Sequence, residues 1–171
     1  DNIRVASLII KKLDNLLKSH VEDPNERVKF VIAAYNSGLA HIYDAMALAE
    51  KYLAANYNKE GYDVVDHYTY ALCGDGCLQE GLSQEAISFA GTQKLNKLIL
   101  FYDANNVTLD GGLEMSSNED TKKRFESCHW NVIELKDGNN LKAIDRAICK
   151  AKESKDKPTI IICHTIIGLG S

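Results

Sequence analysis

Long apolar runs are missing from this sequence, and so is any excess of positive charge. The longest apolar runs, Leu98–Tyr102 and Thr159–Cys163, are far shorter than the roughly 20 residues that a membrane-spanning helix needs, and no cleavable signal opens the chain. A net charge of −4 provides no broad basic field for a nucleic-acid backbone or an anionic membrane surface. We therefore expect a soluble protein that has neither nucleic acid nor a membrane as a partner.

Linkers and a disulfide framework are lacking as well. The chain has only two prolines, and no Pro/Gly-rich segment or internal repeat divides its 171 residues. A chain of this length can bury one sizeable core and is too short for two ordinary domains. The five cysteines are odd in number, and several lie in apolar runs, where cysteine commonly acts as a small hydrophobe. We expect reduced thiols and a cytoplasmic location.

The N-terminal third has the pattern of helices. Apolar residues recur at intervals of three to four positions from Asn2 to Tyr57, which predicts three helices. Asp23 is suited to cap the second helix, and Pro24 to occupy its first turn, where no amide donor is needed. We expect this helix to end near Ala34, before a turn at residues 35–38. The expected apolar stripes are Ile3, Ile9, Leu13, Leu16 and Leu17 in the first helix and Ile42, Met46, Ala49 and Leu53 in the third.

Beyond Gly61 the pattern changes to short β-rich runs that alternate with helical stretches. Continuous apolar strands flanked by helices predict an α/β fold: a parallel sheet of about four strands with helices on both faces, preceded by the N-terminal helical segment. The expected strands are Tyr68–Cys73, Leu98–Asp103, Asn131–Leu135 and Thr159–His164, and the expected helices are Leu78–Lys94, Asn118–Cys128 and Leu141–Ser154.

Candidate ligand-binding residues follow two of these strands. Gly74 and Gly76 allow close backbone approach to an anion at a helix start, and a diphosphate would fit there. Asp75 would repel a bare phosphate, so the arrangement makes sense if a hard cation such as Mg²⁺ or Ca²⁺ bridges the two. Asn105 and the carbonyl of Val107, after the next strand, could supply further oxygen ligands at the same sheet edge. The alternative for Gly-Asp-Gly alone is a turn with a solvated aspartate.

The pairing of Gly-Asp-Gly with Asn-Asn about 30 residues later resembles the signature of thiamine-diphosphate enzymes, and the surrounding sequence is similar to transketolase. The similarity covers residues 53–171. It is carried by the stretches from Asp66 to Gly81, Phe101-Tyr102-Asp103, Leu109-Asp110-Gly111 and Ile166 to Ser171. The resemblance implies a thiamine-diphosphate-binding domain in which Asp75, Asn105 and the Val107 carbonyl hold Mg²⁺ and Gly74 and Gly76 face the diphosphate.

The same resemblance gives Glu80 and Glu85 two open interpretations. They match acidic positions at the subunit interface and in the proton network of transketolases, or they belong to a solvated helix face. No catalytic residue is assigned. The family transfers a ketol unit between sugar phosphates in the pentose phosphate pathway, as a homo-oligomer in the cytoplasm. The family's N-terminal histidines and its second domain have no counterpart in this sequence, so we expect weak cofactor binding and no ketol transfer by this chain alone.

Residues 1–52 resemble a different family, the C-terminal part of lysozyme-like lytic transglycosylases. The similarity is carried by the stretch from Asp23 to Phe30 and by Ala33 to Gly38, and it implies that Tyr35 and Asn36 line a glycan cleft. The alternative is an ordinary helix C-terminus. The two resemblances meet within one predicted helix near residues 47–52, and a crossover there is the simplest explanation. The rival functions are therefore a glycan-binding module and an inert α/β scaffold.

Overall fold

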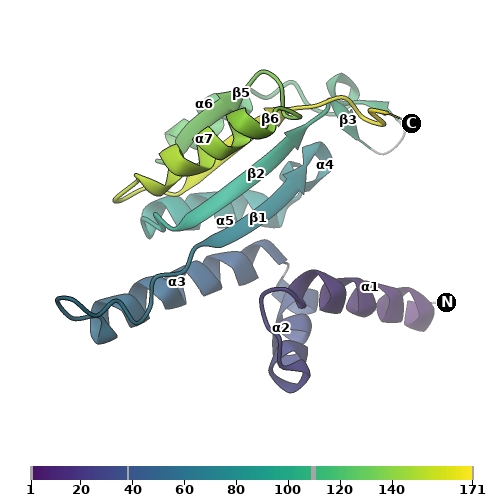
Figure 1. Cartoon of the computed structure of the whole chain (residues 1–171). Helices are drawn as coiled ribbons and strands as arrows, with labels where there is room; N and C mark the ends of the chain where they lie inside the picture. Colours follow the sequence, from purple (N-terminus) through teal and green to yellow (C-terminus); the bar gives the residue numbers. More distant parts are fainter. Residues whose placement is uncertain (1, 38, 109–110, 171) are drawn as a thin grey trace.

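The N-terminal part of the computed structural model is a group of three helices. The structure describes residues 2–37, 39–108 and 111–170. Helices α1 (Asn2–Leu17) and α2 (Pro24–Ser37) contact each other, and α2 contacts α3 (Leu39–Tyr57). Leu13, Leu17, Val31, Ala34 and Ile42 form their shared core, which we call the helical cluster. Figure 1 shows that only α3 runs along the sheet, while α1 and α2 project away from it.

The remaining chain forms a four-stranded parallel sheet in the order β1-β2-β6-β5. Its strands are β1 (Thr69–Gly74), β2 (Leu98–Ala104), β5 (Asn131–Leu135) and β6 (Thr159–His164). The connecting helices are α4 (Asp75–Leu78), α5 (Gly81–Thr92), α6 (Thr121–Ser127) and α7 (Leu141–Lys152). Between β2 and α6 the chain forms a small hairpin of β3 (Val107–Thr108) and β4 (Gly111–Gly112), followed by a 3₁₀ turn at Leu113–Met115. The predicted α/β fold is confirmed.

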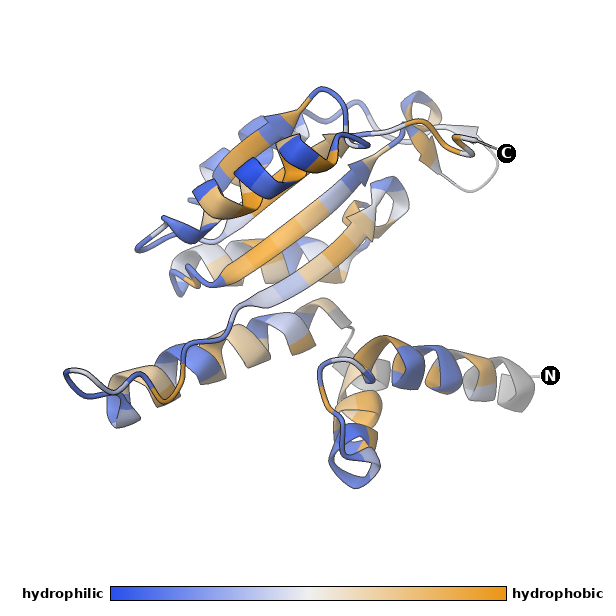
Figure 2. Cartoon of the chain, viewed as in Figure 1, coloured by the Kyte–Doolittle hydropathy of each residue, from blue (hydrophilic) through white to orange (hydrophobic). Residues whose placement is uncertain are grey.

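Helices cover both faces of the sheet. On one face α3, α5 and α6 bury a core, the sheet cluster, and on the other face α7 covers a smaller core around Ile99 and Ile161. The apolar strands lie between helices with mixed surfaces (Figure 2). Trp130 packs edge-on against Phe125 with ring centroids 5.1 Å apart and donates to the Ile87 carbonyl, as expected for a core residue. The sheet cluster comprises Ala47, Ile87, Ala90, Leu95, Leu98, Tyr102, Ala104, Phe125, Trp130, Ile160 and Ile162.

Several sequence predictions need correction. The helix predicted at Leu78–Lys94 is wrong at its start, where α4 and α5 are separate helices, because the backbone of Glu80 between them is extended. The turn predicted at residues 35–38 is wrong for 35–37, which remain helical to the end of α2. In α3 the predicted stripe is partly wrong, since Leu53 is 38% exposed. Asp44 and Glu50 are buried there instead.

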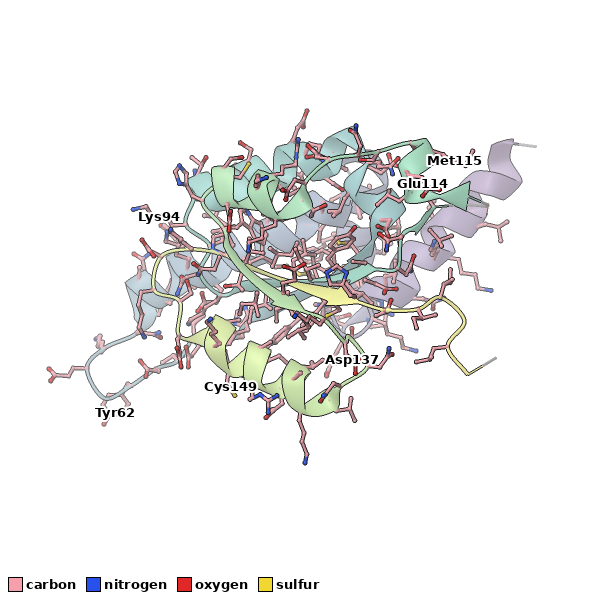
Figure 3. The ribbon with its side chains drawn as sticks, turned by 90° about the horizontal axis from the view of Figure 1, so that it is seen from above. Tyr62, Lys94, Glu114, Met115, Asp137 and Cys149 are labelled. Atoms are coloured by element: carbon pink, nitrogen blue, oxygen red, sulfur yellow. The ribbon has the colours of Figure 1, made fainter. Side chains whose placement is uncertain are left out.

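The predicted cap of the second helix is confirmed. The Asp23 side chain accepts a hydrogen bond from the Asn25 amide at 2.8 Å, which caps α2. All five cysteines are free thiols, and Cys149 lies on the exposed side of α7 (Figure 3). No helix in the described part of the chain is both long and apolar enough to cross a membrane.

Candidate functional site

The carboxyl ends of β1 and β2 bring the predicted site residues to one edge of the sheet. In the parallel register Gly74 of β1 lies beside Asp103 of β2, so the residues that follow each strand are neighbours. Asp75 opens α4 directly after β1, and α4 also contacts β3, which begins at Val107. Two sequence segments about 30 residues apart therefore meet here, as the sequence predicted.

Asp75 is the centre of this edge. Its side chain is only 3% exposed, so the alternative of a solvated aspartate in a turn is wrong. One carboxylate oxygen accepts from the Tyr102 hydroxyl at 2.6 Å. The other accepts from the backbone amides of Asn105 and Asn106, both at 3.1 Å. These three donors fix the orientation of the carboxylate toward the loop after β2.

Tyr102 is a site residue that sequence reasoning missed. It lies on the face of β2 that carries Leu98 and Ala104, under α5, and from there its hydroxyl reaches Asp75. Burial first, and then the hydrogen bond to Asp75, raise the pKa of Tyr102, so it remains a neutral donor. Strand alternation predicts that Tyr102 shares a face of β2 with Leu98 and Ala104. The sequence does not show that Asp75 lies toward this face.

The loop after β2 adopts a conformation that directs two consecutive amides at one oxygen. Asn106 has a φ of +60°, in the left-handed region that asparagine tolerates better than most residues. The Asn105 side-chain oxygen accepts from the Val107 amide at 3.0 Å, and its nitrogen donates to Asp103 at 3.2 Å. Asp103 also accepts from the Thr165 hydroxyl. The Asn105 amide group is therefore held in one orientation.

The predicted ligand set fits a hard cation chemically. Asp75 offers a carboxylate, Asn105 an amide oxygen and Val107 a backbone carbonyl, which are the oxygen donors that Mg²⁺ and Ca²⁺ take. Within the described residues, no group of three or more His, Cys, Asp or Glu side chains could hold a metal by itself. A cation here would therefore depend on these mixed oxygens together with those of a ligand.

Gly74 and Gly76 leave room for a ligand beside Asp75. A Cβ built on either glycine would meet nothing within 4 Å, so protein packing alone does not require glycine at these positions. The open space is what a group approaching the backbone closely would occupy. The four residues of α4 give only a short helix, so backbone approach matters more here than a helix dipole.

A groove of about 460 Å³ adjoins this edge on the face of the sheet that α7 covers. Asn105 and Asp103 contribute polar groups to its lining, and Leu72, Ile166 and Ile167 contribute apolar ones. The size and the mixed lining resemble those of small-molecule sites, which are mostly apolar with a few placed polar groups.

The other predicted residues lie away from this centre or outside the described structure. Glu80 is exposed and immediately precedes α5, and Glu85 is exposed on α5 with its Oε2 3.7 Å from His41 Nε2. Within the described residues neither forms a hydrogen bond or ion pair with Asp75, and their interface role stays a prediction. Tyr35 and Asn36 lie on the backbone of α2 while their side chains fall outside the described residues, as do Leu109 and Asp110 entirely.

Comparison with known proteins assigns a family to most of this chain. The family model "Transketolase, thiamine diphosphate binding domain" matches residues 16–171. The transketolase of Staphylococcus aureus (strain MW2) is 56% identical over 126 residues, which cover 74% of this chain and 19% of that protein. Transketolase 1 of Escherichia coli (strain K12) is 43% identical, over 96% of this chain and 26% of that protein. The solved transketolase from Leishmania mexicana is 43% identical with a TM-score of 0.75, over 79% of this chain and 20% of that chain.

These matches bear on the N-terminal segment and on the extent of the similarity. They give no support to the predicted resemblance of residues 1–52 to lytic transglycosylases, since the family model begins at residue 16. The chain spans about a fifth to a quarter of the length of these curated relatives.

Proposed function

The chain belongs to the transketolase family, within its thiamine-diphosphate-binding domain, and from this premise we propose that it binds the diphosphate of thiamine diphosphate through Mg²⁺. The observation that carries the proposal is the buried Asp75 carboxylate, held by amides from the end of the neighbouring strand. These hydrogen bonds orient the Asp75 carboxylate, which lies between two glycines, Gly74 and Gly76, that have open space beside them.

The proposed roles follow from the atoms that each residue presents. Asp75, Asn105 and the Val107 carbonyl hold Mg²⁺, and Ca²⁺ is an acceptable substitute because it takes the same oxygen ligands. Gly74 and Gly76 let the diphosphate approach the backbone. Tyr102 acts on Asp75 rather than on the ligand. The groove lined by Leu72 and Ile167 accommodates the less polar remainder of the cofactor.

The wider activity is also a proposal. Thiamine diphosphate, when bound, supplies the carbanion chemistry of ketol transfer, while the protein binds and orients it. We propose sugar phosphates as substrates only where other segments complete the site. We also propose a homo-oligomeric assembly with Glu80 and Glu85 at its interface or in its proton network. A cytoplasmic location would suit the free thiols.

The glycine at position 76 offers a direct test. Gly76→Ala places a methyl group in the open space beside Asp75 and should abolish binding of thiamine diphosphate in the presence of Mg²⁺, measured by calorimetric titration. Gly81→Ala is the matched control, because a Cβ there also meets nothing within 4 Å and Gly81 lies in α5. The proposal fails if the folded wild-type chain shows no saturable binding, which is the result expected of an inert scaffold, or if both variants bind alike.

The glycan-binding alternative gains no observation from the described residues. It would need peptidoglycan binding by the intact chain that is lost in Tyr35→Ala.

A further inference from the structure

Asp44 is a buried acid in the middle of α3. The residue is only 4% exposed, and its Oδ2 reaches no hydrogen-bond partner. A buried carboxylate that stays ionised without a partner is costly. Burial accordingly raises the pKa of Asp44 to about 7. Asp44 thus gains or loses its charge near neutral pH while it remains inside the protein.

His41 lies one turn before Asp44 and faces two carboxylates. Its Nδ1 is 4.0 Å from Asp44 Oδ2, and its Nε2 is 3.7 Å from Oε2 of Glu85 on α5. Both separations exceed a hydrogen bond, and both are within the range of an ion pair. The imidazole ring therefore lies between a buried acid on its own helix and an exposed acid on the neighbouring helix.

The charged groups around this trio are few. The elements packed against α3 are α2, α5, β1 and β2. Among the described residues of these four elements, only Glu85 forms an ion pair with His41. None of them forms an ion pair with Asp44, whose ion-pair partner is His41 on α3 itself. On α2, Arg27 pairs with Asp14 and Lys29 pairs with Glu26. The other titratable side chains on the strands packed against α3 are Tyr70, Cys73, Tyr102 and Asp103. On α3 itself, the ring of Tyr43 meets that of His20 at a tilt of 57°, with centroids 5.6 Å apart.

The trio occupies the junction between two cores. Ile42 belongs to the helical cluster, and Ala47 belongs to the sheet cluster. Asp44 lies between them on the same helix, which is the element that joins α1 and α2 to the sheet in Figure 1. A change in the α3–α5 contact at this point would alter how the helical cluster is attached to the α/β part.

We propose that Asp44, His41 and Glu85 form a proton-operated clasp between α3 and α5, closed in weak acid and open in weak base. In the closed state, one proton is bound to the Asp44–His41 pair, and the ring lies within ion-pair distance of both carboxylates. In the open state, the proton has left to solvent, and the buried Oδ2 of the Asp44 carboxylate has no hydrogen-bond donor. The device uses none of the residues proposed to hold the cofactor and shares only Glu85 with the proposed subunit interface; its test needs neither cofactor nor assembly, so it can fail separately from the proposed function.

The direction of the pH effect follows from proton linkage. An acid whose pKa is raised from 3.8 to about 7 in the folded state binds more protons when folded than when unfolded. Its contribution to stability is complete below 3.8 and is lost as the pH rises through about 7. Between pH 6 and pH 8 this single group should reduce the folding equilibrium constant about tenfold.

Urea unfolding of the intact chain at pH 6 and pH 8 tests the clasp through two complementary variants. Asp44→Asn removes the titrating group, so it should stabilise the chain at pH 8 and abolish the tenfold loss between the two pH values. His41→Gln removes the bridging ring, so it should destabilise the chain at pH 6 and change little at pH 8. Asp145→Asn, the same change on the exposed side of α7, is the matched control and should keep the wild-type pH dependence.

Two results would overturn the proposal. The first is an Asp44→Asn chain with the same loss between pH 6 and pH 8 as wild type. The second is a His41→Gln chain that loses equal stability at both pH values, which would indicate a packing role alone. The second result is informative even if Asp44→Asn does not fold.

Discussion

Replacing Asp75 by alanine should destabilise the fold even when no ligand is present. The change removes the acceptor of three hydrogen bonds and leaves the buried Tyr102 hydroxyl without its carboxylate acceptor. An unsatisfied buried donor costs about 1–3 kcal/mol, and each of the two part-buried amides, which water can reach, adds about 0.5–1.5 kcal/mol. We therefore expect Asp75→Ala to lower the free energy of unfolding by about 4 kcal/mol.

A double-mutant cycle with Tyr102→Phe separates the contributions. In wild type, Tyr102→Phe removes one bond of 2.6 Å to a carboxylate and should cost about 2 kcal/mol. In the Asp75→Ala background the same change should cost nothing or recover part of the lost stability, because it removes a hydroxyl that has already lost its carboxylate acceptor. Urea denaturation of the four chains measures both values. An Asp75→Ala chain within about 1 kcal/mol of wild type, or two additive changes, would refute the hydrogen-bond arrangement.

Three further changes test other parts of the fold. Lys97→Met should lower the free energy of unfolding, measured by urea denaturation, by about 3–5 kcal/mol. The reason is that the buried Glu50 carboxylate, which lies 2.5 Å from Lys97 Nζ, loses its cation. A loss below about 1 kcal/mol would contradict this. Gly91→Ala should prevent native packing, visible as lost near-UV circular dichroism, since its Cβ would lie 1.8 Å from the Cys128 carbonyl oxygen. The Cys73 thiol, whose pKa is raised mainly by burial, should resist iodoacetamide at pH 8 while the exposed cysteines react; fast native-state labelling of Cys73 would contradict this.

The main sheet could be predicted from sequence because its strands are short apolar runs between helical patterns. All four strands were placed within one or two residues of their bounds, and β5 and β6 match fully. The hairpin of β3 and β4 was missed, because two strands of two residues each are too short for any periodicity. The break between α4 and α5 was missed because no proline or unambiguous cap marks it.

The candidate site was predictable as far as its ligand atoms and no further. Gly-Asp-Gly and Asn105 point to the sheet edge because parallel strands end together. The partners of the Asp75 carboxylate depend on which face of β2 carries Tyr102 and on the left-handed Asn106, and neither follows from local pattern. Asp44 was also unpredictable, since a helical stripe assigned by hydrophobicity leaves acids on the outside.

The N-terminal helices were predicted correctly as elements, but the family suggested for them has no support. The Ala-Tyr-Asn-x-Gly segment is short, and its residues suit the last turn of many helices. The end of α2 is such a place, because α2 runs to Ser37 and α3 begins at Leu39. The third helix continues through residues 47–52, so the predicted meeting point of the two resemblances lies inside one continuous helix.

The most direct test of the central claim is calorimetric titration of thiamine diphosphate into the intact chain, once with Mg²⁺ and once after chelation of divalent metals. The buried Asp75 with Asn105 and the Val107 carbonyl predicts saturable binding that appears only with the metal. Equal binding with and without Mg²⁺, or no binding by a chain whose circular dichroism shows it to be folded, would contradict the metal-bridged diphosphate site.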